Sequence, residues 1–523
     1  MRLILRKKHF LCKPLLVLDF GFLLWYPFFR IPHLSTEMSR SSSAYSVKIA
    51  QICFALGFLG IVLFGLRSMM RGSNMNMALV VGAVIMFAVV FLLDARYWAF
   101  PAFCFGYYET MPYIRFTGAE LGCLVLISTY FIRMAIHRDI LSKGMKRPLL
   151  AAVPFMVWVC MVWAMNPTGL NMFGSTTIGG RFYFKILLSF FAMVCLSFLR
   201  FNEQDCKILI YAVACGYLAF TIRTFLFGDT ENQLMGTGTH YAFIHMSFVA
   251  PVFLCRFSAP ELLSKGWPML GFLVSFGLSF YSGNRTAAAR PVVVGALAPF
   301  FLKRDRVKTV GMMVCSAFVL GVVVAGQGNV WRLPFAIQRP LSVLPGKWDR
   351  RLEDYGLNDT FRETLRMYAR EHIRESPWVG DGGFAMDLQE VAWTNARNAY
   401  GDTFSGHVVA RNWHNVWLGM AADFGIPLSV FWGCFMLVLM ISGYKGAKTL
   451  PPGSWQQTSY LYFYLLILTE FLNFFFNGGH TSLTTQQLFV WAGLLMAVRN
   501  GVRDIASNPI HPELVSGHLP TGA

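Results

Sequence analysis

The chain of 523 residues is poor in charged side chains, which make up only 14% of it, and it lacks the usual nucleotide- and metal-binding motifs. It contains no GxxxxGK[ST] phosphate loop, no GxGxxG turn after a strand and no HExxH pair. It also shows no internal repeat with a period of roughly 20–50 residues. These absences argue against an ATP-hydrolysing or dinucleotide-dependent enzyme, a zinc protease of this type and a repeat protein.

The eleven cysteines are scattered, mostly within apolar runs, and no two of them form a CxxC pair. The segment 327–413 contains no cysteine at all. The sequence therefore excludes a disulfide scaffold and a cysteine-based zinc site in that segment.

Apolar sequence, by contrast, is abundant: 55% of the residues are hydrophobic and 16% are aromatic. A helix needs about 20 mostly apolar residues to cross the hydrocarbon core of a membrane. The sequence predicts an all-α fold, a polytopic integral membrane protein with about 12–14 transmembrane helices. The clearest predicted spans are 48–66, 76–94, 115–134, 149–165, 182–199, 206–226, 240–255, 267–281, 286–302, 307–326, 415–441, 458–476 and 483–499.

The net charge of +18 is concentrated in short segments between the apolar runs. Because short loops rich in Lys and Arg stay in the cytoplasm, this distribution indicates membrane topology and not a nucleic-acid partner. The predicted cytoplasmic anchors are Arg133 to Arg147, Arg200 with Lys207, Arg256 with Lys265, Lys303 to Lys308, Lys445 with Lys448, and Arg499 with Arg503. The segments predicted on the opposite, outer side are 166–181, 227–239, 282–285, 327–413 and 477–482.

This topology divides the chain into five parts. They are an N-terminal segment 1–47, an N-terminal transmembrane bundle 48–326, a large outer loop 327–413, C-terminal transmembrane helices 414–499 and a cytoplasmic tail 500–523.

The apolar run 14–32 fits a first transmembrane helix, a signal-like segment, or sequence upstream of a start at Met38. The parity of the spans favours a helix. The aromatic stretch 97–108 fits an additional short or re-entrant span.

The outer loop 327–413 owes its positive charge almost entirely to arginine, with ten Arg and one Lys against eleven Asp and Glu. A guanidinium binds phosphate or carboxylate through two hydrogen bonds, which lysine cannot do, so the loop is suited to hold an anion. The capping box from Thr360 to Glu363 and the stop at Pro377 predict a helix over 361–376.

Within the predicted helix, arginine recurs at every fourth position, at Arg362, Arg366, Arg370 and Arg374. For the last three we favour a solvated face with ion pairs to neighbouring glutamates. Arg366 is kept as a supporting candidate for anion binding beside Arg362.

Arg285 lies in YSGNRTAAAR, between two apolar runs on the predicted outer side. An arginine there gains nothing from the positive-inside rule, so it either snorkels to the lipid interface or binds a ligand. A helix beginning near Thr286 would direct its free amide groups at whatever Arg285 binds, and an anion fits both features.

His414 and Asn415 stand at the end of the loop, directly before a long apolar run. A neutral imidazole there can act as a general base, although a lone histidine is more often a hydrogen-bonded interfacial residue. Asn415 can orient a ring or a sugar hydroxyl, and Arg411 adds positive charge. We interpret Trp413 and Trp417 as ordinary membrane-interface anchors.

Three motifs together resemble the O-antigen ligase and O-antigen polymerase superfamily of bacterial membrane glycan transferases. They are SGNRT at 282–286, PWVGDGGF at 377–384, and HNVWL at 414–418 followed by DFGIP. The likeness in architecture covers roughly 115–499, and the His-Asn motif is its most specific element. The family commonly has Glu at the position of Asp423 and a second small residue at that of Pro427.

The resemblance implies glycan transfer from undecaprenyl diphosphate on the periplasmic face of the bacterial inner membrane, without a metal or other cofactor. It implies that Arg285 and Arg362 bind the diphosphate. His414 would activate the acceptor hydroxyl of a lipid A core, in lipopolysaccharide biosynthesis. Asp423 would lie about 13 Å from His414 along an ideal helix, so it is left out of the catalytic set.

Two alternatives stay open. One is a polymerase of the same superfamily, in which a second lipid-linked glycan is the acceptor. The other is a polysaccharide transporter or flippase, a class that often places ionisable residues near the membrane midplane. Here the notable polar groups gather at one face and in one loop, which favours an enzyme. Glu470 and His480 lie near the same face and have no assigned role.

Overall fold

The computed structural model describes residues 98–107, 116–136, 147–165, 180–227, 241–302, 306–350, 352, 357–381, 413, 415–476 and 481–507. These residues all belong to one compact unit, Phe58–Ala523. The N-terminal segment 1–47 and the predicted spans 48–66 and 76–94 lie outside the described residues.

The described part of the chain is built from helices and contains no β-strand, as the sequence predicts. Its helices are α4 (Ala99–Gly106), α5 (Gly118–Ile136), α6 (Arg147–Met165), α7 (Gly180–Phe198), α8 (Glu203–Phe227), the 3₁₀ helix η5 (Tyr241–His245), α9 (Met246–Arg256), α10 (Ala259–Ser264), α11 (Gly266–Tyr281), α12 (Arg285–Leu302), α13 (Arg306–Gly326), α14 (Phe335–Leu341), α16 (Leu357–Glu375), α19 (Val416–Phe424), α20 (Ile426–Ala447), α21 (Trp455–Phe476) and α22 (Thr481–Ser507).

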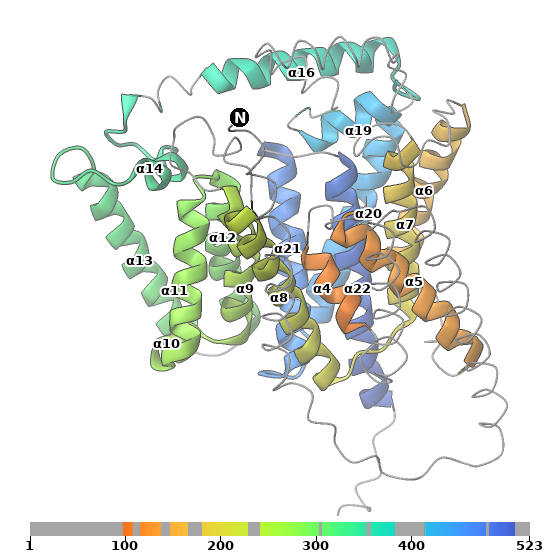
Figure 1. Ribbon diagram of the computed structural model, residues 1–523, viewed down its shortest axis with the longest axis horizontal. Coiled ribbons are helices and arrows are strands. Elements are labelled where there is room, and N and C mark those ends of the chain that lie inside the picture. Colours follow the sequence, from red (N-terminus) through yellow and green to blue (C-terminus); the bar gives the residue numbers. More distant parts are fainter. Residues whose placement is uncertain are drawn as a thin grey trace, which may run out of the picture. The chain divides into compact units, whose positions relative to one another are not determined.

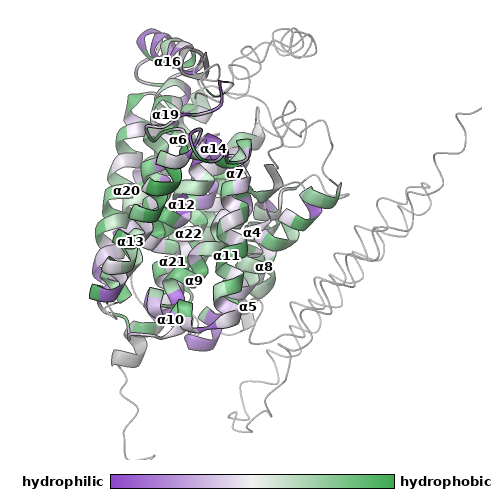
Figure 2. Cartoon of the chain, turned by 90° about the vertical axis from the view of Figure 1, so that its left-hand side faces the viewer, coloured by the Kyte–Doolittle hydropathy of each residue, from purple (hydrophilic) through white to green (hydrophobic). Residues whose placement is uncertain are grey.

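Length and composition make this chain a helical membrane protein. Five helices, α6, α8, α13, α20 and α21, are long and apolar enough to cross a membrane, and α5, α7, α9 and α11 contain shorter apolar stretches. Figure 2 shows apolar residues over the bundle and hydrophilic residues on α16. The total of 12–14 spans and the side of the membrane that each end faces stay predictions.

The core of the bundle surrounds α21. In α21, 72% of the most apolar window is buried within the protein, compared with 17% in α13. Side chains of α21 and α22 fill the centre, among them Tyr460, Tyr462, Phe463 and Phe489, none more than 1% exposed. α13 therefore presents most of its surface to the surrounding medium, as expected for a helix at the edge of a membrane bundle.

Two of the predicted cytoplasmic anchors, Arg256 and Lys207, meet at one end of the bundle. The Arg256 guanidinium lies 4.3 Å from the Trp455 ring and its Nη1 donates to the Gly453 carbonyl at 2.7 Å. Lys207 Nζ lies 5.9 Å from the same ring. The opposite end is crossed by α16 (Figure 1), and we call it the α16 end. Grouping of these anchors at one end agrees with the predicted alternation of the spans.

Most predicted spans from 115 onward match described helices within a few residues, with three exceptions. The run 240–255 is divided between η5 and α9, and α22 continues to Ser507, eight residues past the predicted end of its span and into the predicted tail. The run 415–441 is not a single helix, because α19 ends at Phe424 and α20 begins at Ile426. Between them Gly425 has φ +84°, a conformation open to glycine, and Pro427 follows in the first turn of α20. The apolar composition of this run hides the break.

The aromatic stretch near residue 100 forms α4, which has only eight residues. An eight-residue helix is about 12 Å long, too short to cross the hydrocarbon core. α4 packs closely on α8, where a Cβ on Gly216 would lie 2.2 Å from the Phe103 carbonyl oxygen. The stretch thus forms a short helix, and its assignment to a re-entrant span stays a prediction.

Candidate functional site

Arg285 is the first residue of α12 and lies exposed at the α16 end (Figure 1). Its Nη2 donates to the Ser342 hydroxyl, at the end of α14, over 3.1 Å. The predicted free amides of this helix start are partly used, because Asn284 Oδ1 accepts from the Ala287 N–H at 3.0 Å. The guanidinium itself is therefore the main feature here that can attract an anion.

α16 begins at Leu357, four residues earlier than predicted, and runs to Glu375. The capping box from Thr360 to Glu363 is therefore inside the helix and does not start it. Arg362 consequently lies in the second turn. The helix thus begins before its strongest start signal, as is common at helix ends.

The arginines of α16 fall on two different faces. Arg370 and Arg374 are exposed, while Arg362 and Arg366 are half-buried beside the buried Leu365. A helix that lies across the end of a bundle turns one side toward it, and Arg362 and Arg366 share that side. The solvated-face interpretation is confirmed for Arg370 and Arg374.

Glu363 contacts two of these arginines, Arg370 at 3.3 Å and Arg366 at 3.5 Å. Both are surface contacts of small energetic value. Arg366 differs from Arg370 in that its Nε is buried and has no hydrogen-bond partner within the described residues. Arg366 therefore has donor capacity that its glutamate neighbour leaves unused.

The PWVGDGGF motif after α16 and the DFGIP motif between α19 and α20 form one backbone junction. The Ile426 N–H donates to the Pro377 carbonyl at 2.8 Å, and the Asp381 N–H donates to the Ala422 carbonyl at 3.0 Å. A Cβ on Gly425 would lie 1.9 Å from the Trp378 carbonyl oxygen, so only glycine fits. The turn after α16 is thereby fixed to the break between α19 and α20.

Trp413 is buried under this junction, with only 1% of its surface exposed. It packs in a cluster with Ala369 of α16 and Ala422 of α19. Its Nε1 donates to Asp423 Oδ1 at 3.5 Å. The interpretation of Trp413 as a membrane-interface anchor is wrong, because α16 and α19 pack over its side chain, and Asp423 serves this packing.

A histidine-carboxylate pair supports the same cluster. His372 Nδ1 lies 2.8 Å from Asp381 Oδ2, and the His372 ring lies 5.6 Å from the Trp413 ring. This pair ties the last turn of α16 to the junction. The Trp417 ring, on the second residue of α19, lies 5.6 Å from the Phe475 ring of α21.

His414 and Arg411 lie outside the described residues, but both neighbours of His414 are described. Trp413 is held in the buried cluster, and Asn415 is the N-cap of α19. Asn415 Oδ1 accepts from the Leu418 N–H at 3.0 Å. The side-chain oxygen of Asn415 is thus occupied by the cap of α19. Asn415 therefore supports the site by fixing the start of this helix.

A buried ionic network was not predicted from the sequence. Arg290 of α12 donates to Glu470 of α21 and to the Ser247 hydroxyl, and its guanidinium lies 3.7 Å from the Phe248 ring. Arg290 is 5% exposed and Glu470 is 4% exposed. The available signal was an ionisable residue inside an apolar run, which in membrane proteins usually marks function or a specific pairing.

The network continues to the α16 end through Asn473. Its Nδ2 donates to Glu470 Oε2 at 3.0 Å, and its Oδ1 accepts from the Thr286 hydroxyl at 3.2 Å. Thr286 directly follows Arg285. α12 is therefore joined to α21 through two successive turns, which fixes the helix start that presents Arg285.

The convergence of the three principal site residues stays a prediction. Arg285 and Arg362 belong to elements at the same end, and His414 is linked to α19 there. The two small cavities that we find between the described helices are lined by other residues. Within the described residues, no group of three or more His, Cys, Asp or Glu is arranged to hold a metal ion.

No protein-family model matches this chain, and no curated protein is significantly similar to it in sequence. The functional interpretation therefore depends on the residues themselves.

Proposed function

We propose that this protein is an O-antigen ligase-like glycosyltransferase that acts at a membrane surface. The observation that carries the proposal is the α16 end itself. The start of α12 with its exposed arginine, a helix with half-buried arginines and the N-cap of α19 belong to this end of an apolar bundle, and His414 directly precedes that N-cap in the sequence. A lipid with a phosphorylated headgroup matches this combination of cationic and apolar surface.

In the proposed reaction the donor is a glycan linked to undecaprenyl diphosphate. Arg285 and Arg362 hold the diphosphate, and Arg366 and Arg411 support them. His414 takes the proton of the acceptor hydroxyl, whose oxygen attacks the anomeric carbon. The bond from that carbon to the phosphate oxygen breaks, and the diphosphate leaves with the electron pair. The arginines stabilise the charge that develops on it, and the configuration is inverted.

We place this reaction on the periplasmic face of the bacterial inner membrane, with a lipid A core as the acceptor. The reaction needs no redox step and no nucleotide, and the proposal includes no metal or other cofactor. The prenyl tail of the donor would lie against the apolar helices below.

A polymerase of the same superfamily would use the same chemistry with a second lipid-linked glycan as acceptor. Deleting the gene separates the two. Loss of a ligase leaves long chains on the lipid carrier, whereas loss of a polymerase leaves single repeats attached to the core.

The Arg290–Glu470 pair favours transport as a second candidate, since transporters place paired ionisable residues inside the membrane. Vesicles that contain the purified protein and a lipid-linked glycan on one leaflet discriminate between the two functions. The ligase proposal predicts consumption of donor when acceptor is on the same side, with no change in the leaflet distribution of unreacted donor. Movement of donor without bond cleavage would favour the transporter.

A further inference from the structure

A small cavity with a mostly apolar lining and a few polar side chains lies between α4, α5 and α22, away from the arginines of the proposed site. It is lined by Phe105, Thr117, Ala119, Gln486, Gln487, Val490 and Trp491. Its volume is about 20 Å³. A cavity that holds one water molecule needs about 10–15 Å³ on this measure, so one oxygen-sized polar group fits.

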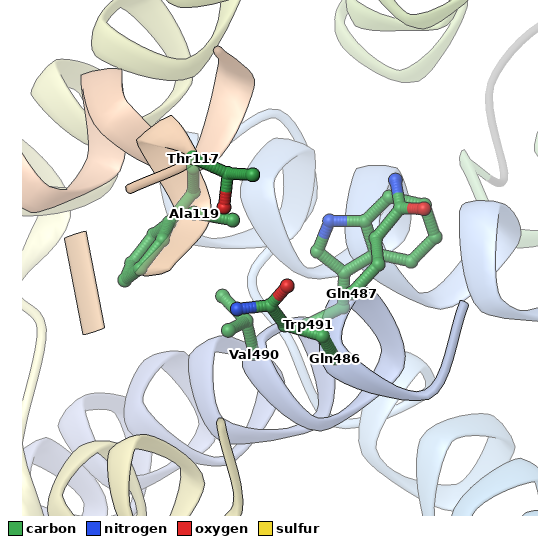
Figure 3. Close-up of a pocket in the computed structure, with 7 residues that line it drawn as sticks. Thr117, Ala119, Gln486, Gln487, Val490 and Trp491 are labelled. Atoms are coloured by element: carbon green, nitrogen blue, oxygen red, sulfur yellow. The ribbon is translucent and has the colours of Figure 1, made fainter. Parts of the chain in front are cut away.

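Gln486 is the unusual member of this lining. It is 1% exposed, and its Nε2 has no hydrogen-bond partner within the described residues. Figure 3 shows its amide extending from α22 toward the side on which Ala119 of α5 and Thr117, just before α5, lie. Buried amide groups nearly always have a partner, so this N–H group calls for one in the cavity.

A second buried glutamine shows what a structural amide looks like in this bundle. Gln457 of α21 is 2% exposed. Its Oε1 accepts from the Gly453 N–H at 2.8 Å, and its Nε2 donates to the Phe301 carbonyl at 3.4 Å. Gln457 thus links the loop at Gly453 to α12 at Phe301. The amide nitrogen of Gln486 makes no such link within the described residues.

The other polar groups of the cavity complement an oxygen ligand. The Thr117 hydroxyl accepts from the Glu120 N–H at 3.2 Å and keeps its own proton for donation. Gln487 Nε2 donates to the Tyr217 hydroxyl at 3.5 Å, which leaves its Oε1 able to accept. A hydroxyl group, which both accepts and donates, satisfies this set.

The cavity is joined by packed aromatic side chains to the helix that presents Arg285. The Trp491 ring lies 6.0 Å from the Phe248 ring, and Phe248 packs under the Arg290 guanidinium of α12. Gln486 itself lies in the second turn of α22. These contacts join the lining of the cavity, through Phe248, to the helix that begins with Arg285.

We propose that this cavity, the Gln486 pocket, binds one hydroxyl group of the glycan substrate and determines which sugar is accepted. The proposal rests on the proposed transferase function and adds a specificity subsite to it. Gln486 Nε2 donates to the sugar oxygen, and only this oxygen enters the pocket, whose volume holds one such group.

The test uses the full-length protein in nanodiscs, with a lipid-linked glycan and a series of analogues that each lack one hydroxyl. We expect Gln486→Leu to lower kcat/KM for the complete glycan by about 3- to 10-fold, the loss of one neutral hydrogen bond. One deoxy analogue should show the same loss with the wild-type protein and no further loss with Gln486→Leu. An equal decrease for every analogue, or no decrease at all, overturns the proposal, and the group in the pocket is then water only.

Thermal unfolding provides the matched control. Gln486→Leu should lower the unfolding temperature less than Gln457→Leu, because no hydrogen bond of the Gln486 amide nitrogen is lost, whereas Gln457 loses bonds of both amide atoms. A decrease for Gln486→Leu as large as that for Gln457→Leu would assign Gln486 a structural role and contradict the proposal.

Failure of the proposed function is recognised separately. If the wild-type protein transfers no glycan, binding of the same lipid-linked glycan and its deoxy analogues is measured directly. The proposal then predicts that one deoxy analogue binds the wild-type protein more weakly than the complete glycan does. The Gln486→Leu variant should bind this analogue and the complete glycan equally. Equal affinities for all analogues with the wild-type protein would exclude the pocket.

Discussion

At the residue scale, the two half-buried arginines of α16 are distinguished from their exposed neighbours by geometry. Arg362 and Arg366 lie beside the buried Leu365, whereas Arg370 is exposed and pairs with Glu363. The role of each guanidinium therefore depends on its helix face and not on the four-residue spacing that they share.

Arg362→Lys is expected to lower kcat/KM for glycan transfer by roughly tenfold or more, because lysine keeps the charge and loses the two-point contact with a diphosphate. Arg370→Lys on the exposed face is the matched control and should leave the kinetics unchanged. Steady-state kinetics with the lipid-linked donor measure both. Equal behaviour of the two variants would remove Arg362 from the site.

Asn415 is expected to act through the start of α19. Asn415→Ser keeps an N-cap oxygen and should retain most of the activity, whereas Asn415→Ala should lose about 1 kcal/mol of stability together with activity. Unfolding temperature and transfer rate are measured side by side. If serine abolishes transfer at unchanged stability, the amide contacts substrate directly and the capping role is insufficient.

At the element scale, the junction between the turn after α16 and the α19–α20 break decides where the outer loop attaches. Two backbone hydrogen bonds and a glycine-only approach at Gly425 form it. Trp413 lies buried beneath it, so the end of the loop is held between this cluster and the N-cap of α19.

Gly425→Ala should destabilise the protein by about 1–3 kcal/mol from backbone strain alone, with further loss from the contact with the Trp378 carbonyl. Gly277→Ala on α11, where a Cβ meets nothing within 4 Å, is the control. Thermal unfolding in detergent compares them. Equal unfolding temperatures would show that the junction contributes little.

Most elements of this fold are predictable from the sequence, because apolar runs near 20 residues determine helices directly. The break at Gly425 was missed because the apolar run continues through it, although Gly425 and Pro427 are local signals for a helix end and a helix start. The early start of α16 was missed because helix ends are the least certain part of a sequence-based prediction. The cluster around Trp413 was not predicted, because a tryptophan at the membrane interface and a tryptophan covered by another segment have the same local sequence.

At the scale of the whole molecule, the Arg290–Glu470 network joins α9, α12 and α21 inside the bundle. The sequence shows each ionisable residue in its apolar run but not their pairing, which spans 180 positions. Taking both charges out of water is unfavourable, and the pair is stable because hydrogen bonds satisfy both partners.

Glu470→Gln removes the counter-charge and leaves Arg290 buried, so we expect a loss of roughly 3–5 kcal/mol of stability. Replacing both residues by methionine should restore most of that loss, because no buried charge remains. Unfolding measurements of the single and double variants check this. A double variant as unstable as the single one would show that the hydrogen bonds, and not the charge balance, hold the helices.

The proposal of a lipid-diphosphate glycosyltransferase is tested most directly by transfer with purified components. Wild-type protein in nanodiscs is mixed with undecaprenyl diphosphate-linked glycan and lipid A core, with and without a metal chelator, and product is followed by mass spectrometry. We predict transfer in both conditions and a decrease of roughly 100- to 10,000-fold in the correctly inserted His414→Ala variant. Undiminished transfer by His414→Ala, or no transfer by the wild-type protein to either a lipid A core or a second lipid-linked glycan, would contradict the account.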